Sequence, residues 1–87
     1  MSVKERMTEK LRQAFAPVFL EVIDDSHQHA GHSGARPGGQ THFTVRIAAA
    51  AFAGKSRVQQ HRAINAVLAE ELAGGVHALA IEARAAG

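Results

Sequence analysis

The 87-residue chain contains no cysteine, no tryptophan and no tyrosine, and these absences exclude several functions. Without cysteine the chain forms no disulfide and no thiolate nucleophile, so any metal ligand that it supplies is His, Asp or Glu. With four phenylalanines as its only aromatic residues, it has little with which to stack single-stranded bases. It also lacks an apolar run of the about 20 residues that span a bilayer, and its charged N-terminus is unlike a signal peptide. We therefore expect a cytoplasmic protein without a membrane segment.

A chain of this length has room for one hydrophobic core, so we expect residues 1–87 to form a single domain. The formal net charge is only +2, but the basic residues are unevenly distributed, because residues 41–62 contain no acid. The basic side chains of this block are Arg46, Lys55, Arg57 and Arg62. Such a block suits contact with phosphate or with an acidic protein surface, and it is also typical of a solvated helix face.

Capping patterns predict two helices. Ser2-Val3-Lys4-Glu5 has the form of a capping box, and Pro17 prevents continuation, so the first helix ends near Phe15. A second helix begins after Ser56, with Gln59 as the partner in its capping box. We expect it to run to Gly74-Gly75, because glycine adopts the left-handed cap conformation without steric cost. Its buried stripe consists of Ile64, Val67, Leu68 and Leu72, with His61 as a structural residue on the flank.

Three strands are expected, over residues 18–24, 41–47 and 76–84. The first and third are rich in apolar and β-branched residues, and the second alternates between apolar and polar positions. Residues 48–54 form a short alanine-rich connection with room for one helical turn. Residues 25–40 are rich in glycine and histidine, which predicts a long flexible loop, and residues 85–87 predict a flexible tail.

The order α-β-β-α-β predicts an α/β (α+β) fold with a three-stranded mixed sheet and the helices packed on one face. The first two strands form a hairpin across the long loop, and the crossover through the second helix makes the second and third strands parallel. The end of the first strand, the loop and the starts of the other two strands then meet at one edge of the domain. Five histidines fall in these segments: His27, His29, His32, His42 and His77.

These histidines are the candidates for chemistry, because neutral imidazole is the commonest protein ligand for transition metals. The spacing of His27, His29 and His32 is like that of a metal-binding tract, but a glycine-rich loop alone does not fix its geometry. His77 shares the strand parity of Leu79, which predicts that it faces the helices at the rim of the core. No nucleophile and base stand in a recognisable arrangement, so we expect no enzymatic activity.

Four groups of residues occur in an order that is typical of one known family: Leu20-Glu21-Val22-Ile23-Asp24-Asp25-Ser26; Thr41-His42-Phe43; Ala51-Phe52-Ala53-Gly54-Lys55-Ser56 with Gln60-His61-Arg62; and Leu68-Ala69-Glu70-Glu71-Leu72 followed by Val76-His77-Ala78-Leu79-Ala80. In these segments, which extend over nearly the whole chain, the sequence resembles the BolA family. The resemblance implies a fold like the class II KH module, which agrees with the predicted order of elements.

The resemblance also implies a function. BolA proteins bind monothiol glutaredoxins and share a [2Fe-2S] cluster with them, or act in its transfer, with glutathione supplied together with the glutaredoxin. Bacterial members are also described as DNA-binding transcriptional regulators of morphology and stress response. By this resemblance the family's histidine ligand corresponds to His77 and its loop ligand to His29, with His27 and His32 as alternates.

Two hypotheses follow for this chain. In the first it is a non-enzymatic adaptor, monomeric alone, that forms a heterodimer with a monothiol glutaredoxin for iron-sulfur cluster assembly, trafficking or iron sensing. His29 and His77 would ligate one iron and thiolates the other, an asymmetry like that of Rieske centres. In the second hypothesis it is a transcriptional regulator that binds double-stranded DNA through Lys55, Arg57 and Arg62.

Overall fold

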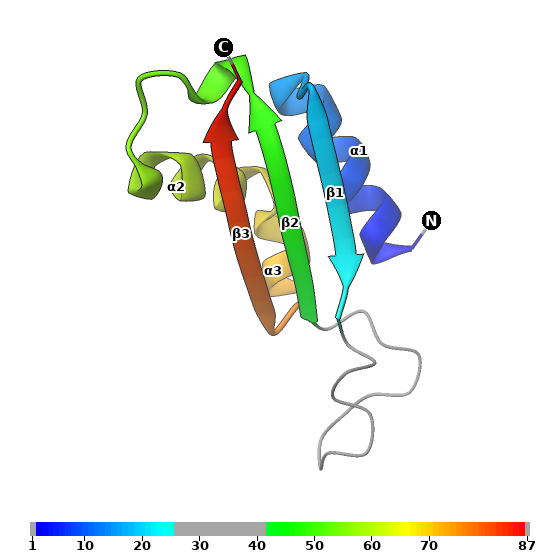
Figure 1. The fold of residues 1–87 in the computed structure, drawn as a ribbon. Coiled ribbons are helices and arrows are strands. Elements are labelled where there is room, and N and C mark those ends of the chain that lie inside the picture. The colour runs from blue at the N-terminus through cyan, green and yellow to red at the C-terminus, as the bar shows by residue number, and fades with distance from the viewer. Residues whose placement is uncertain (1, 26–41, 87) are drawn as a thin grey trace.

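The structure is a computed structural model that describes residues 2–25 and 42–86. Its elements are α1 (Val3–Phe15), β1 (Phe19–Asp24), β2 (His42–Ala49), the short 3₁₀ helix η2 (Ala50–Phe52), α2 (Arg57–Val67), α3 (Ala69–Ala73) and β3 (Ala78–Ala85). The predicted order α-β-β-α-β is confirmed, except that the second helix is divided into α2 and α3 (Figure 1). Of the predicted loop over 25–40, all residues but the first lie outside the described part of the chain.

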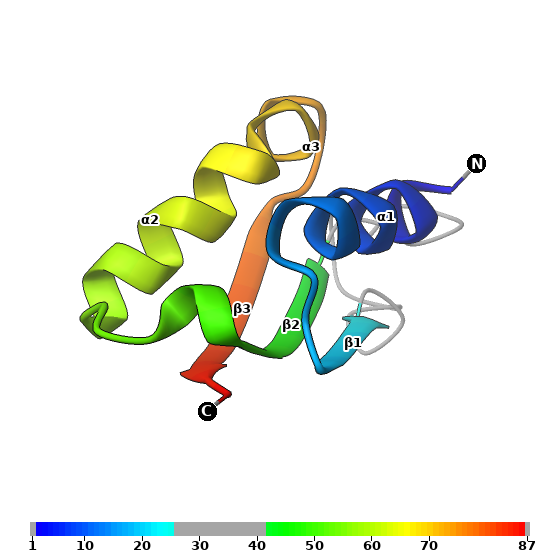
Figure 2. The same cartoon turned by 90° about the horizontal axis from the view of Figure 1, so that it is seen from above.

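The three strands form one mixed sheet in the order β1-β2-β3. β1 and β2 are antiparallel, with Val22 opposite Val45, and β2 and β3 are parallel, with Val45 opposite Ile81. Figure 2 shows all helices on one face of the sheet, as predicted. In the described ranges, no helix is both long and apolar enough to cross a membrane.

Helix α1 has the predicted boundaries because both ends are fixed by local chemistry. The Glu5 backbone N–H donates to the Ser2 hydroxyl at 3.1 Å, and the Ser2 backbone N–H donates to the Glu5 carboxylate at 3.3 Å. The helix ends at Phe15 and is capped by Ala16, whose φ of 44° is left-handed and whose N–H donates to the Arg12 carbonyl. Pro17 disfavours helical backbone at the residue before it, so the chain turns there toward β1.

The prediction of one continuous second helix is wrong. Its capping box at Ser56 and Gln59 is present, but helical geometry stops at Val67 and resumes at Ala69, with Leu68 at φ −99° and ψ 16°. The Leu68 side chain is fully buried, so packing against the core outweighs regular helical backbone at this position.

The double glycine does end the helix, but by a different device at each residue. Gly74 has a φ of −94°, so the predicted left-handed conformation is wrong for this residue. Glycine fits there because an added Cβ would lie 3.0 Å from the Glu70 carbonyl oxygen. Gly75, with a φ of 134°, supplies the positive φ that turns the chain back toward the sheet.

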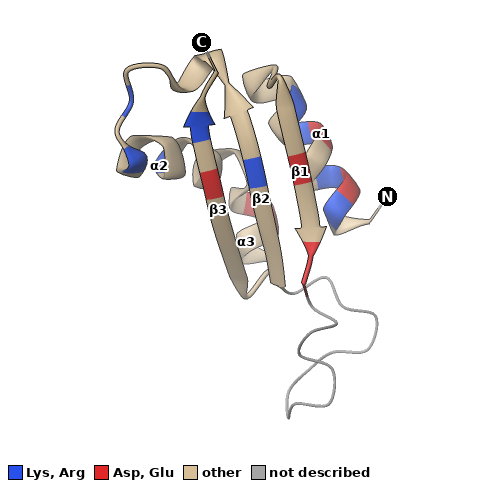
Figure 3. Ribbon diagram, in the orientation of Figure 1, with Lys and Arg blue, Asp and Glu red and all other residues tan. Residues whose placement is uncertain are grey.

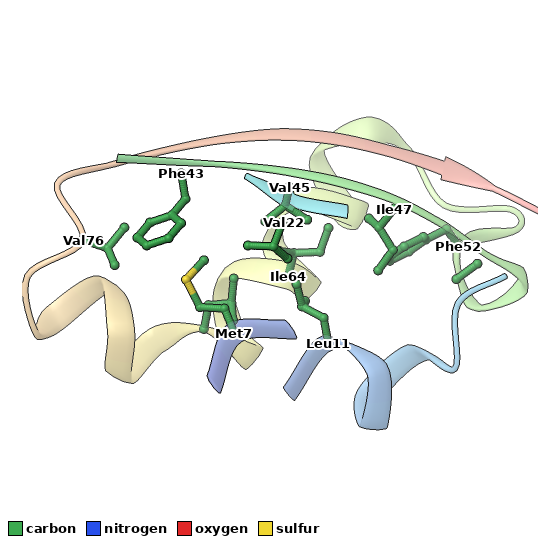
Figure 4. Close-up of a cluster of buried hydrophobic side chains, with 11 residues drawn as sticks. Met7, Leu11, Val22, Phe43, Val45, Ile47, Phe52, Ile64 and Val76 are labelled. Atoms are coloured by element: carbon green, nitrogen blue, oxygen red, sulfur yellow. The ribbon is translucent and has the colours of Figure 1, made fainter. Parts of the chain in front are cut away.

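One hydrophobic core lies between the sheet and the helices (Figure 4). β2 contributes Phe43, Val45 and Ile47, which confirms the predicted alternation, although the strand continues to Ala49, two residues past its predicted end. β1 contributes Val22, and the helices and neighbouring segments contribute Met7, Leu11, Phe52, Ile64, Leu68 and Val76. The C-terminal tail is shorter than predicted, because Ala85 belongs to β3 and the Ala86 N–H donates to the Ala49 carbonyl at 3.1 Å.

Candidate functional site

The predicted meeting of strand ends is present at one end of the sheet. β1 ends at Asp24, β2 begins at His42, and β3 begins at Ala78, the residue paired with His42 in the parallel register. Figure 1 shows these three strand ends together at one end of the sheet. His42 and His77, which are 35 positions apart in the sequence, therefore lie at the same end of the sheet.

His77 is exposed, and it lies just outside the strand that the sequence assigned to it. The prediction that it faces the helices is wrong for a local reason. Val76 fills the core position and is only 7% exposed, so the next side chain points away from the helices. Regular strand backbone begins one residue later, and Leu79 and Ile81 then face the helices as predicted. The imidazole of His77 is thus accessible to another molecule.

His42 is the neighbour of His77. The centroids of the two imidazole rings are 6.4 Å apart, and the ring planes are tilted by 44°. The sequence analysis placed His42 at this edge without giving it a role. Its position beside His77 follows from the parallel pairing of β2 with β3. Within residues 2–25 and 42–86, no group of three or more His, Cys, Asp or Glu side chains is placed to hold a metal ion. A metal bound beside these rings would need donors from outside that part of the chain.

Asp25 joins the ends of β1 and β2. Its backbone N–H donates to the His42 carbonyl at 2.8 Å, and its carboxylate accepts a hydrogen bond from the Thr44 hydroxyl. These two bonds fix the points at which residues 26–41 leave and rejoin the sheet, next to the histidine pair. The predicted loop ligand His29 and its alternates His27 and His32 belong to this segment and lie outside the described residues.

The segment that carries His77 is anchored through Glu71 of α3. The Glu71 carbonyl accepts the Val76 N–H at 3.1 Å, one residue before His77. The Glu71 side chain, only 4% exposed, receives the Lys10 ammonium at 3.0 and 2.9 Å, and the Arg6 guanidinium lies 3.9 Å away. The carboxylate therefore ties α3 to α1, and the backbone carbonyl of the same residue holds the segment that leads to β3.

The sequence analysis missed this role of Glu71. The signal was present, because Ile64, Leu68 and Glu71 follow the i, i+4, i+7 spacing of one helical face. The spacing places the carboxylate on the buried stripe, where an ionised group needs a partner. Lys10 supplies that partner from a helix that is distant in the sequence.

Charged residues form a row across the three strands (Figure 3), at positions that alternate with the residues packed against the helices. Arg46 of β2 lies between Glu82 of β3, at 3.1 Å, and Glu21 of β1, at 3.5 Å. The hydrogen bond to Glu82, followed by the charges of Glu82 and Glu21, raises the pKa of Arg46 above its usual value. Arg46 is thus paired within the sheet, and it is not part of a separate basic surface.

The remaining basic residues, Lys55, Arg57 and Arg62, are all exposed. Lys55 and Arg57 lie together at the start of α2. Arg62 follows Arg57 by five residues, which places it about 140° further around the helix. The structure therefore brings two of these three predicted DNA contacts together and directs the third to another side of α2.

The family model for "BolA-like protein" matches residues 11–87. An uncharacterized protein encoded in the cobS 5′ region of a Sinorhizobium species is 53% identical over 100% of this chain and 95% of its own length. The DNA-binding transcriptional regulator BolA of Escherichia coli is 46% identical over 93% of this chain and 73% of its own length.

The fold is shared with a solved structure as well. The BolA domain of SufE1 from Arabidopsis thaliana superposes with a TM-score of 0.85 at 48% identity, covering 98% of this chain and 93% of that domain. The full SufE-like protein 1 of that plant is longer, and the present chain spans 22% of its length. The BolA domain of SufE1 is therefore similar to this chain in sequence and in the arrangement of helices and strands.

Proposed function

The chain belongs to the family of BolA-like proteins, and from this premise we propose that it is a non-enzymatic adaptor for a monothiol glutaredoxin. In this proposal the two proteins form a heterodimer and share a [2Fe-2S] cluster, with glutathione supplied together with the glutaredoxin. The cluster is cargo that the pair assembles, transfers or uses to sense iron. The observation that carries the proposal is the exposed imidazole of His77 beside His42, at the end of the sheet to which residues 26–41 are attached.

The donor set of the chain fits a shared cluster. The chain has no cysteine, so it contributes imidazole nitrogens while thiolates come from the partner and from glutathione. We assign His77 as one ligand and His29 as the other, with His27 and His32 as alternates within the same segment. The exposure of His77 supports this assignment, because a partner must be able to approach the ring. Bound in this way, the cluster supplies one-electron redox chemistry and a transferable iron-sulfur unit.

Reconstitution of the mixed complex tests the proposal. The chain, a monothiol glutaredoxin, glutathione, iron and sulfide are combined anaerobically, and visible absorption and circular dichroism are compared with those of the glutaredoxin alone. We expect a changed spectrum that depends on this chain and is lost in His77→Ala. His61→Ala is the matched control, because His61 lies half-buried on α2, away from the histidine pair. Spectra identical to those of the glutaredoxin alone, or equal effects of the two variants, would contradict the proposal.

A second candidate function is duplex DNA binding. The similarity to the DNA-binding transcriptional regulator BolA of Escherichia coli and the exposure of Lys55 and Arg57 favour it. Each phosphate contact contributes about −0.9 to the slope of log affinity against log salt. With two basic side chains together at the start of α2, we expect a slope of about −2 and weak affinity. Fluorescence anisotropy with a labelled duplex measures this slope, and an absence of binding at low salt would rule out the candidate.

A further inference from the structure

β3 has an outer edge that is available for hydrogen bonding. It is the last strand of the sheet, and in the described part of the chain it pairs with β2 alone. The Ala86 N–H donates to the Ala49 carbonyl of β2, so even-numbered residues of this stretch direct their backbone groups toward β2. Because these directions alternate along a strand, Leu79, Ile81, Ala83 and Ala85 direct their N–H and carbonyl groups to the outer edge.

A groove runs along this edge. It has a volume of about 410 Å³ and is lined by Arg57, His61, Ile81, Glu82, Ala83 and Arg84, so α2 forms one wall and β3 the other. Figures 1 and 2 show the first turns of α2 beside β3, on the side away from β2. A volume of this size accommodates several amino-acid residues of a ligand.

The charge that lines the groove is positive. Its one carboxylate, Glu82, is hydrogen-bonded to Arg46 at 3.1 Å. Arg57 forms no ion pair within residues 2–25 and 42–86. The Arg84 guanidinium lies over the Phe19 ring of β1, 5.6 Å from its centroid, so it extends across β2 and away from the outer edge.

From this edge and this charge we propose that the groove binds an acidic peptide segment in extended conformation, which adds to β3 as a fourth strand. A strand edge presents donors and acceptors in alternation, which match the backbone of another peptide. A nucleic-acid backbone offers phosphate acceptors to Arg57, but it lacks the alternating hydrogen-bond donors and acceptors that would match the strand edge. Acidic side chains on the helix side of the added strand lie against Arg57.

This site is separate from the histidine pair. His77 precedes the first residue of β3, whereas the groove is lined by residues 81–84 near its last. At about 3.3 Å per residue, the two sites lie roughly 15–20 Å apart along the strand. The chain can therefore hold a glutaredoxin at one end of β3 and an acidic segment of a second protein at the other.

Nuclear magnetic resonance of the ¹⁵N-labelled chain tests the groove with a synthetic peptide of alternating Glu and Val. We expect shift changes at residues 57–61 and 81–84, and slower amide exchange at Ile81 and Ala83 when the peptide is bound. The Arg57→Glu variant should bind about tenfold more weakly. Lys4→Glu is the matched control, because it makes the same change of charge in the first turn of α1, and its affinity should equal that of the unmodified chain.

Four results would overturn the proposal. The first is no shift change at millimolar peptide, and the second is an equal response to a peptide of alternating Lys and Val. The third is binding without protection of the two amides, which would indicate attraction between charges and no added strand. The fourth is protection that depends on protein concentration without peptide, which would identify a second copy of the chain as the occupant. Circular dichroism of each variant establishes that it is folded.

Discussion

Replacement of Glu71 by glutamine tests how the segment before His77 is held. Glu71→Gln keeps the shape of the side chain and removes its charge, so the Lys10 ammonium faces an amide in place of a carboxylate. The adjacent substitution, Glu70→Gln, is the matched control. Glu70 also lies near Lys10, at 3.8 Å, but its side chain is 88% exposed, whereas that of Glu71 is 4% exposed.

The structure sets the expected magnitudes. Exposed ion pairs contribute about 0.2–1 kcal/mol, and we expect Glu70→Gln to lower the free energy of unfolding by less than about 0.5 kcal/mol. Removing one partner of a fully buried pair costs about 3–5 kcal/mol. Lys10 is 32% exposed and regains hydration, so Glu71→Gln should cost about 2 kcal/mol. For a domain of this size, that loss corresponds to a melting temperature lower by about 8–16 °C.

Urea unfolding followed by circular dichroism measures the loss of stability in both variants. The comparison requires that the free energy of unfolding falls with urea concentration at the same slope in each protein. Loss of the ion pair with Lys10 loosens α3, whose Glu71 carbonyl accepts the Val76 N–H, so we also expect faster amide exchange at Val76 in Glu71→Gln. Equal stability of the two variants would refute the reasoning, since it would mean that burial of the Glu71 carboxylate adds nothing to the pair.

Two further predictions concern the helix cap and the core. Hydrogen bonds from the backbone and side chain of Ser2 hold the pKa of Glu5 below its usual value of 4.5, so their stabilisation is present above that pH and is lost as the pH falls through the folded pKa. The free energy of unfolding should differ less between pH 3 and pH 6 in Glu5→Gln than in the unmodified chain. The same difference in both proteins would contradict this cause. Ile64→Ala should lower the free energy of unfolding in urea by about 3 kcal/mol, because the Ile64 side chain is fully buried. Val58→Ala, at an exposed site on the same helix, should lower it by less than about 0.5 kcal/mol. Similar losses in these two variants would show that the core is wrongly placed.

Most of the fold could be predicted because its signals are local. The capping boxes at Ser2 and Ser56 and the alternation from Phe43 to Ile47 each involve residues a few positions apart, and the structure confirms all three. The mixed sheet followed from the order of elements and the handedness of the crossover. Local pattern and global arrangement therefore agree over most of the chain.

The sequence analysis failed where distant residues decide the local structure. The interruption at Leu68 depends on packing against the core, and the burial of Glu71 depends on Lys10 of another helix. The orientation of His77 was wrong because strand parity was extended to a residue that precedes the regular strand. The predicted meeting of strand ends was nevertheless correct, because it depends on topology and not on the direction of one side chain.

The central claim is that an imidazole of this chain ligates an iron of a shared cluster. Pulsed electron paramagnetic resonance tests it directly, with the chain labelled with ¹⁵N-histidine and mixed with an unlabelled glutaredoxin around a reduced cluster. The account predicts ¹⁵N couplings from directly bound imidazole, with the coupling of His77 absent in His77→Ala. A spectrum without ¹⁵N coupling, in a mixed complex whose formation is established by its mass, would contradict the account.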